Sequence, residues 1–202
     1  MKPEGVPYFR YPWDGLQSYL ESIDTDHLRL LTYGSLMNRE SASITMLVTA
    51  DTSFVPAIGY GIKRVFNHRM PEQALTRHGF PVSTRHVAAL NVVSTNNVQD
   101  SVNGLLLRID VAHIPGLRDR EIGYDLAPIT AEMWEDREPV SEPVFVLEHP
   151  IIDKGLLPHL QYLKICESGV RSLGAAFLDD FRRTTFLADG TPLTGWNREH
   201  NG

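Results

Sequence analysis

Short runs of clustered or alternating apolar residues dominate the chain up to residue 148, where the spacing changes to that of a helix. The short runs predict strands at 27–33, 54–66, 87–94, 102–109, 126–134 and 144–148. Two C-terminal helices are predicted, with buried faces formed by Leu156, Leu160, Leu163, Leu173, Phe177 and Phe181. Strands that cluster before helices favour an α+β fold over alternating β–α–β units.

Glycine and proline mark the points where these elements are expected to bend or end. The residues concerned are Gly59, Gly61, Pro115, Gly116, Gly169 and Gly174. Gly59 and Gly61 predict a bulge or bend within 54–66, and Pro115 and Gly116 divide the helix-like stretch 111–122 into short turns. Gly169 and Gly174 are expected to mark the ends of the C-terminal helices. Residues 70–85, which are rich in proline and glycine, predict an irregular loop.

The first 27 residues combine prolines, which discourage regular structure, with aromatic residues, which favour burial. We therefore expect residues 1–27 to form an arm, with a short helix near 13–22, that packs on a main domain of residues 28–202. Docking of the arm on a second subunit is an alternative, so a homodimer is a possible assembly.

The composition is that of a folded globular protein, with 202 residues, 42% hydrophobic and 22% charged. A net charge of −6 argues against binding to nucleic acid or to an anionic membrane. The single cysteine, Cys166, excludes an internal disulfide and is expected to be a buried, inert thiol. No apolar run approaches the length of a membrane span, and we expect a cytoplasmic protein.

The first candidate for chemistry is Tyr33-Gly34-Ser35-Leu36-Met37, here called the 33–37 loop. It follows a predicted strand and precedes a polar, helix-tolerant run, so its backbone N–H groups can form an anion-binding nest. Gly34 would let a ligand approach the main chain. An ordinary turn is the alternative, and Ser35 lacks the partner motif expected of a nucleophile.

Histidine and arginine offer weaker candidates. The eight histidines show no spacing typical of a metal site, although His68, His78 and His86 could converge in space. Arg64, Arg69 and His68 could each contact a substrate carboxylate, with an ordinary surface position as the alternative for all three.

Glu121 is the second candidate. In one interpretation it belongs to a solvated charge run and pairs with Arg118, three residues earlier. In the other, it is the last charge before the chain turns inward at Ile122 and Tyr124. A carboxylate at such an edge is partly shielded from water, in an environment suited to acid–base chemistry.

The order of these motifs resembles the γ-glutamylcyclotransferase-like superfamily. The resemblance rests on the 33–37 loop after a strand, and on the sequence Arg-Glu-Ile-Gly-Tyr at 120–124 after a strand and a short helix. The strand at 101–109, with Gly104, matches the element that precedes the family's catalytic glutamate. The resemblance covers residues 28–135. Ile122 is a departure, because many members have glycine directly after the glutamate.

This resemblance implies an α+β fold in which a mixed sheet curls into a small β-barrel with flanking helices, to which this chain adds a C-terminal helical pair. It also implies that a γ-glutamyl amine or peptide is converted to 5-oxoproline and a free amine by intramolecular attack. Glu121 would be the catalytic acid and base, while the γ-glutamyl head would be bound by Tyr33, Gly34, Ser35, Leu36 and Met37, with Tyr124 as an orienting residue.

No metal or cofactor is required for such a reaction, since the nucleophile is the substrate's own amine. Two alternatives remain at the level of sequence. One is a non-catalytic member of the same fold that binds a small ligand. The other is an interaction protein that uses the aromatic arm at residues 1–27.

Overall fold

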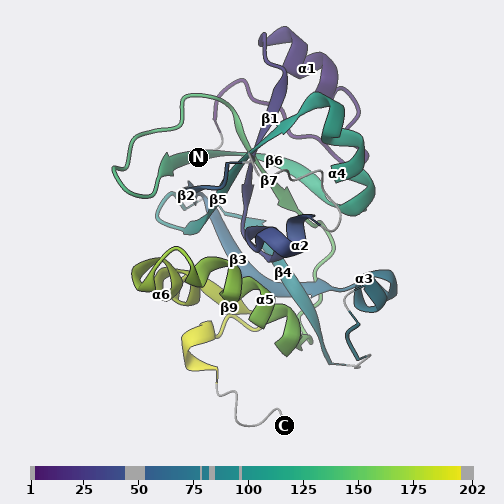
Figure 1. Cartoon of the computed structure of the whole chain (residues 1–202), viewed down its shortest axis with the longest axis vertical. Helices are drawn as coiled ribbons and strands as arrows, with labels where there is room; N and C mark the ends of the chain where they lie inside the picture. Colours follow the sequence, from purple (N-terminus) through teal and green to yellow (C-terminus); the bar gives the residue numbers. More distant parts are fainter. Residues whose placement is uncertain (1–2, 44–52, 78, 82–84, 96, 197–202) are drawn as a thin grey trace.

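The strands divide between two sheets in the computed structural model, which describes residues 3–43, 53–77, 79–81, 85–95 and 97–196. A closed barrel forms one half of the molecule, and a smaller four-stranded sheet with two helices forms the other (Figure 1). This arrangement confirms the predicted α+β fold with a mixed sheet curled into a barrel.

The barrel has the strand order β1-β5-β2-β6-β7 and is closed by a parallel pairing of β7 with β1. Its other pairings are antiparallel. The strands are β1 (His27–Thr32), β2 (Val55–Tyr60), β5 (Ser101–Asp110), β6 (Asp125–Met133) and β7 (Val144–Glu148). Leu30, Leu107 and Phe145, from three of these strands, are almost completely buried. Closure leaves these strands without exposed edges.

The second sheet has the order β8-β4-β3-β9. Its strands are β3 (Ile62–Arg69), β4 (His86–Ser94), β8 (Leu157–Pro158) and β9 (Thr185–Leu187). The central pair is antiparallel, and the two outer strands run parallel to their neighbours. The sequence pattern does not reveal β8 and β9, because two or three residues are too few to show alternation.

The predicted single stretch at 54–66 is wrong, because the chain leaves one sheet and enters the other within it. Strand β2 ends at Tyr60 and β3 begins at Ile62, and the residue between them, Gly61, has a φ of 75°. The N–H and carbonyl of Gly61 bond to Asp100 and Thr95, at either end of the β4–β5 connection. The bend expected at glycine is therefore the crossing between the two sheets.

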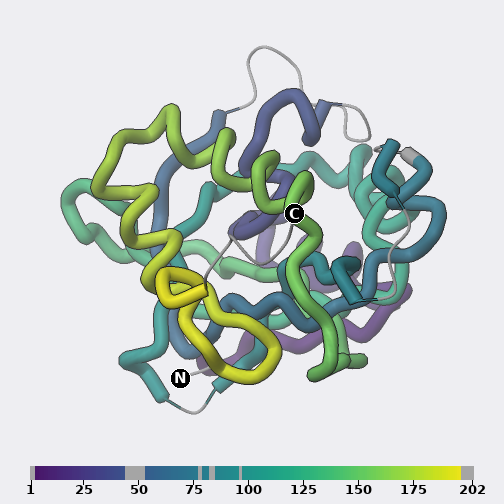
Figure 2. The backbone as a smooth tube through the Cα atoms, turned by 90° about the horizontal axis from the view of Figure 1, so that it is seen from below, coloured from purple at the N-terminus to yellow at the C-terminus, as the bar shows by residue number. Residues whose placement is uncertain are grey.

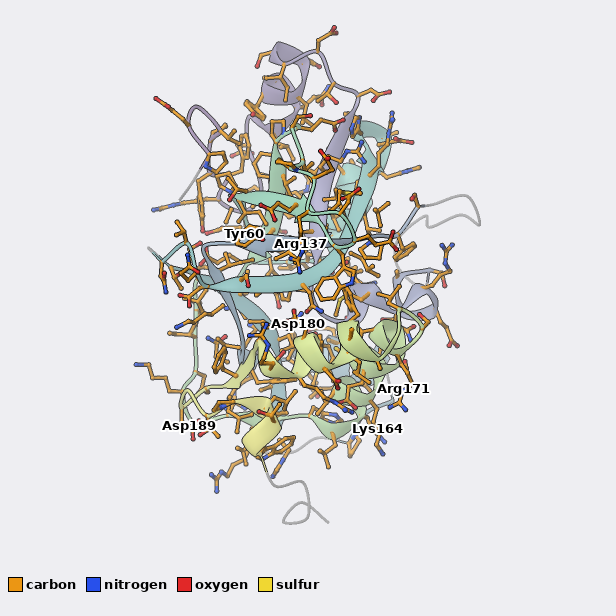
Figure 3. All side chains as sticks on the ribbon, turned by 90° about the vertical axis from the view of Figure 1, so that its left-hand side faces the viewer. Tyr60, Arg137, Lys164, Arg171, Asp180 and Asp189 are labelled. Atoms are coloured by element: carbon orange, nitrogen blue, oxygen red, sulfur yellow. The ribbon has the colours of Figure 1, made fainter. Side chains whose placement is uncertain are left out.

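Helices α5 (Leu160–Arg171) and α6 (Ala175–Arg183) form the predicted C-terminal pair and contact β4 and β9 respectively. Figure 2, a view from below, shows the pair on the near side of the molecule. In Figure 3 the labelled Lys164, Arg171 and Asp180 lie on this helical half, below Tyr60 and Arg137 of the barrel half. Leu156 and Leu173 lie outside the helices, contrary to the prediction, since Leu156 precedes α5 and Leu173 lies between α5 and α6.

Gly169 lies inside α5 and does not end it, contrary to the sequence prediction. A Cβ atom added there would lie 2.7 Å from the backbone nitrogen of Asn38 and 2.7 Å from the carbonyl carbon of Met37. Since Cβ atoms do not approach other heavy atoms so closely, only glycine allows α5 to press against the backbone at the end of the 33–37 loop. The helix thus fixes the position of the loop.

The remaining helical elements are shorter. They are α1 (Leu16–Ser22), α2 (Arg39–Ser43), α3 (Glu72–Arg77) and α4 (Ile114–Arg120), with 3₁₀ turns η1 (Ser35–Met37), η2 (Val111–His113) and η3 (Leu193–Gly195). Helix α3 falls within the predicted loop at 70–85, so that prediction is wrong there. Helix α4 continues through Pro115 and Gly116, because proline in the first helical turn removes no intrahelical hydrogen bond. The break predicted at those residues lies instead before Ile114.

The N-terminal segment packs on the start of β6. Phe9 forms a β-bridge with Leu126, and the indole Nε1 of Trp13 donates to the carbonyl oxygen of Tyr124 over 2.7 Å. The Tyr8 hydroxyl donates to Asp125 over 2.8 Å. These contacts attach the segment next to Tyr124. Among the described helices, none combines the length and the apolarity needed to cross a membrane.

Candidate active site

The 33–37 loop begins where β1 ends, and it turns at once into the 3₁₀ turn η1. The N–H groups of Met37 and Asn38 bond back to the carbonyls of Gly34 and Ser35, over 3.0 and 3.1 Å. The N–H groups of Ser35 and Leu36 stand at the start of this turn and have no acceptor within it. The Ser35 N–H donates to the hydroxyl of Tyr162 on α5, and the Leu36 N–H has no hydrogen-bond partner among the described residues.

Two tyrosines hold this loop. The Tyr33 hydroxyl donates to the carbonyl of Leu147 over 2.6 Å and so ties the loop to β7. The hydroxyl oxygen of Tyr162, from α5, would lie 2.7 Å from a Cβ atom at position 34, which explains the glycine there. Burial raises the pKa of Tyr162 well above its ordinary value, and a backbone hydrogen bond from Ser35 acts in the opposite direction.

The sequence pattern does not identify Tyr162 as part of the site. The only signal is a hydroxyl on a helix face that otherwise reads as apolar, and the pattern does not say what that hydroxyl meets.

Glu121 is the C-cap residue that follows α4, and its side chain is only 15% exposed. The carboxylate oxygen Oε1 accepts a hydrogen bond from Nε of Arg120 over 2.5 Å. Arg120 is itself 7% exposed and also donates to the backbone carbonyl of Ser41 over 3.2 Å. The partner predicted for Glu121 in the charge-run interpretation, Arg118, is therefore wrong.

Two adjoining cavities meet at the loop and the glutamate. The larger has a volume of about 420 Å³ and the smaller about 40 Å³. Both are lined by Ser35, Glu121, Tyr124 and Tyr162. These four residues come from η1, the end of α4, the segment before β6, and α5, so the fold brings four distant stretches of sequence to one place.

The structure gathers most of the candidate residues around these cavities. Tyr33, Gly34 and Leu36 line the smaller cavity together with the four shared residues. Met37 lines neither, because it is buried and its backbone packs against Gly169 of α5.

An aromatic cluster adjoins the site and includes Tyr124, which lines both cavities. The Tyr124 ring lies 5.1 Å from the ring of His68 and 5.0 Å from that of His149, and the two histidine rings are 4.0 Å apart. Burial raises the pKa of Tyr124 well above its ordinary value, and the charge of Glu121 adds to this. Burial, and then the neighbouring His149, lower the pKa of His68 to about 3. His68 is therefore neutral at physiological pH.

The histidines that lie close together are not the set considered from the sequence. The ring beside His68 is that of His149, while His86 begins β4 and His78 lies outside the described residues. Within the described part of the chain, no three histidine, cysteine or acidic side chains are grouped so as to hold a metal ion. Cys166 is buried, as expected, and burial raises its pKa to about 12.

The two arginines considered as substrate contacts have other roles. Arg64 is completely buried and donates to neutral groups, among them Asn103 and Thr185, so neither a surface nor a substrate-contacting role holds for it. Arg69 is exposed and pairs with Asp153 over 3.2 Å. His68, the third candidate, does line the larger cavity.

His68 should make the protein less stable in acid. Its pKa in the folded chain, about 3, lies below its ordinary value of 6.5, so between these values the unfolded chain binds a proton that the folded chain does not. Stability must then fall as the pH falls through this window. On lowering the pH from 7.5 to 5, we expect His68 to remove about 2 kcal/mol from the free energy of unfolding.

Urea unfolding of the unmodified protein and of His68→Asn at both pH values measures this effect. Because asparagine does not titrate, the variant should lose about 2 kcal/mol less than the unmodified protein. Equal losses for the two proteins would show that His68 is not held neutral by burial.

Comparison with known proteins supports the fold by structure and not by sequence. No family model and no curated protein matches the chain. A solved structure described as gamma-glutamyl cyclotransferase aligns with a TM-score of 0.59 and 15% identity, over 86% of this chain and 95% of that one. YkqA from Bacillus subtilis aligns with a TM-score of 0.60 and 16% identity, over 83% of this chain and 57% of that one. At these identities the likeness establishes the fold, which is γ-glutamylcyclotransferase-like, as predicted.

Proposed function

We propose that this protein is a γ-glutamylcyclotransferase-type enzyme, which converts a γ-glutamyl amine or peptide into 5-oxoproline and a free amine. One observation carries the proposal. The carboxylate of Glu121, largely shielded from solvent, lines the same cavity as the start of the 33–37 loop. The fold shared with a gamma-glutamyl cyclotransferase supports it.

The reaction needs little from the protein in covalent terms. The substrate's free α-amine attacks its own γ-carbonyl carbon, a new C–N bond closes a five-membered lactam, and the original amide C–N bond breaks. The proton lost by the attacking nitrogen is balanced by the proton gained by the leaving amine, and no water is consumed. Because both reacting groups belong to one molecule, holding the substrate in a bent conformer supplies much of the rate advantage.

The 33–37 loop would receive the charged head of the substrate. The Leu36 N–H at the start of η1, and the Tyr162 hydroxyl to which the Ser35 N–H donates, can bond the α-carboxylate or the oxygen of the tetrahedral intermediate, where fixed donors are most effective. Tyr162 and Tyr124 wall the same space, and their raised pKa values keep both hydroxyls protonated and able to donate.

Glu121 would carry the proton from the attacking amine to the leaving amine. Its Oε1 atom is held by Arg120, and within the described part of the chain its Oε2 atom has no hydrogen-bond partner. Arg120 therefore fixes the carboxylate in one orientation and leaves one oxygen for the substrate. The carboxylate that would transfer the proton is thus held rigidly in the lining of the cavity.

The same contact also favours a second candidate function. Arg120 holds the carboxylate by a charge-assisted hydrogen bond over 2.5 Å, and a carboxylate fixed in this way suits a binding protein that recognises the substrate's ammonium group without transferring a proton. In that case the protein would bind γ-glutamyl compounds and release them unchanged.

One assay separates the two functions. The protein is incubated with glutathione, γ-glutamyl amino acids and γ-glutamyl-ε-lysine, and 5-oxoproline is measured by chromatography. We expect time-dependent release from at least one compound, in proportion to protein concentration. Saturable binding without release would favour the binding protein, and neither binding nor release would contradict both candidates.

A further inference from the structure

The larger cavity extends well beyond the residues assigned to the γ-glutamyl head. One part of its lining, here called the outer part, is formed by Met70 and Pro71, which follow β3, by Gln73 and Ala74 of α3, and by Ile122. All of these side chains except the amide of Gln73 are apolar. The cavity therefore continues from the proposed reaction centre into a largely apolar space.

Ile122 is the unusual member of this wall. Its side chain is 65% exposed, although a large aliphatic residue usually favours burial. It directly follows Glu121 in the chain and lines the same cavity. An apolar side chain in this position gains burial when a ligand covers it, so its exposure points to an apolar ligand group.

The charges around the cavity have a definite sign. Its charged lining side chains in the described part of the chain are Asp119, Arg120 and Glu121, which sum to −1. The guanidinium of Arg120 is engaged by Glu121, whereas Asp119 is exposed and forms no ion pair with the described residues. His68, which is neutral, adds no positive charge. A second carboxylate in this space would meet a net negative charge.

We infer that the outer part of the cavity is a subsite for the leaving amine, and that it selects amines with an apolar body and no carboxylate. Ile122 would contact the apolar body, and Asp119 would exclude a carboxylate. The inference rests on the proposed function, because only that function assigns the inner part of the cavity to the γ-glutamyl head.

A γ-glutamyl amino acid differs from a γ-glutamyl amine at one point that matters here. Its carboxylate is attached to the carbon next to the scissile nitrogen, so it cannot move away from Glu121 and Asp119. The corresponding amine, which lacks this group, places only its hydrocarbon chain against Ile122 and Met70. Discrimination therefore arises from repulsion as well as from contact.

A matched pair of compounds tests the inference. γ-Glutamyl-3-methylbutylamine and γ-glutamyl-leucine have the same hydrocarbon chain and differ only in the carboxylate. For 5-oxoproline release by the unmodified protein, we expect kcat/KM to be at least about tenfold higher for the amine. An equal or higher value for the leucine compound would overturn the inference.

The same pair separates this inference from the proposed function. If neither compound releases 5-oxoproline but both bind, turnover of these two compounds is excluded and the ratio of their Kd values, measured by calorimetry on the unmodified protein, decides selectivity alone. A lower Kd for the amine would then support the subsite. Equal values, or no binding of either compound, would overturn it.

Single substitutions locate the selectivity. Ile122→Ser should lower kcat/KM for the amine by about fivefold, because apolar contact is lost. Ile151→Ser is the matched control, since Ile151 is 73% exposed and does not line the cavity, and it should change nothing. Asp119→Asn should raise kcat/KM for γ-glutamyl-leucine by about threefold. Equal effects of the two isoleucine substitutions, or no gain with Asp119→Asn, would refute the assigned roles.

Discussion

Replacing Glu121 by glutamine is expected to lower kcat for 5-oxoproline release by about 10²- to 10⁴-fold, the usual contribution of a positioned acid–base group. Glutamine has nearly the same shape, and its amide oxygen can still accept the hydrogen bond from Arg120. It cannot take up the proton of the attacking amine. The loss should therefore appear in kcat at saturating substrate, measured by steady-state kinetics.

The substitution also has a structural cost that the experiment must separate from catalysis. Arg120 is largely buried, and Glu121→Gln removes the negative charge beside it. Removing one partner of a buried ion pair is destabilising, here by about 1–3 kcal/mol given the residual exposure of both groups. Activity must be compared well below the unfolding midpoint of the variant, after circular dichroism has shown native structure.

A second glutamate supplies the matched control. Glu138 is exposed in the turn between β6 and β7 and does not line either cavity, so Glu138→Gln makes the same chemical change elsewhere. We expect its kcat and KM to match those of the unmodified protein. Turnover by Glu121→Gln within about threefold of that control would remove Glu121 from the mechanism.

The sequence predicted the location of Glu121 near the loop better than it predicted its partner. The rule that residues three apart face each other on a helix indicated Arg118. Glu121, however, stands at the end of α4 with φ −100° and ψ 50°, outside the helical region. The i, i+3 relation no longer holds at such a position, and the adjacent Arg120 becomes the partner. Where a helix ends is among the least predictable features of a sequence.

The 33–37 loop could be predicted because its signal is local. A glycine-containing turn after an apolar strand is visible within a few residues. Tyr162 and Gly169 approach the loop from α5, far along the chain. Which residues of a distant helix meet the loop depends on how the helix packs, and local periodicity gives only its apolar face. The part of the site that α5 contributes could therefore not be predicted from a single sequence.

The division into two sheets could not be predicted from the sequence, for a related reason. Both β2 and β3 have strand-like composition, and Gly61 alone stands between them. One glycine is equally compatible with a bulge in a continuous strand and with a crossing between sheets. The outcome depends on whether the flanking strands find different partners, which are β5 and β6 for β2 but β4 and β9 for β3.

Arg64 has the position least expected from its residue type. Of the substitutions proposed, replacing this residue should reduce the stability of the fold most. It is fully buried, and burial lowers its pKa to about 9, so the guanidinium is still charged at neutral pH. It donates to Asn103 of β5 over 2.8 and 2.9 Å, to the carbonyl of Phe181 over 3.0 Å, and to the Thr185 hydroxyl over 2.7 Å. The side chain thus connects the barrel, α6 and β9.

Arg64→Met should lower the free energy of unfolding by about 3 kcal/mol, because several buried acceptors would lose their donor. The cost of burying a charge would also disappear, and this reduces the loss. For a chain of this length the midpoint of thermal unfolding should fall by about 6–12 °C. Arg69→Met is the control on the same strand. Its side chain is exposed and pairs with Asp153, so it should cost less than about 1 kcal/mol.

Arg64→Lys tests whether charge or geometry matters at this position. Lysine keeps the positive charge but offers a single donor point, and it cannot reach β5, α6 and β9 at once as the planar guanidinium does. Arg64→Lys should therefore lower the free energy of unfolding at least as much as Arg64→Met does. A loss from Arg64→Met no greater than that from Arg69→Met would show that the hydrogen bonds of Arg64 do not hold the two halves of the fold together.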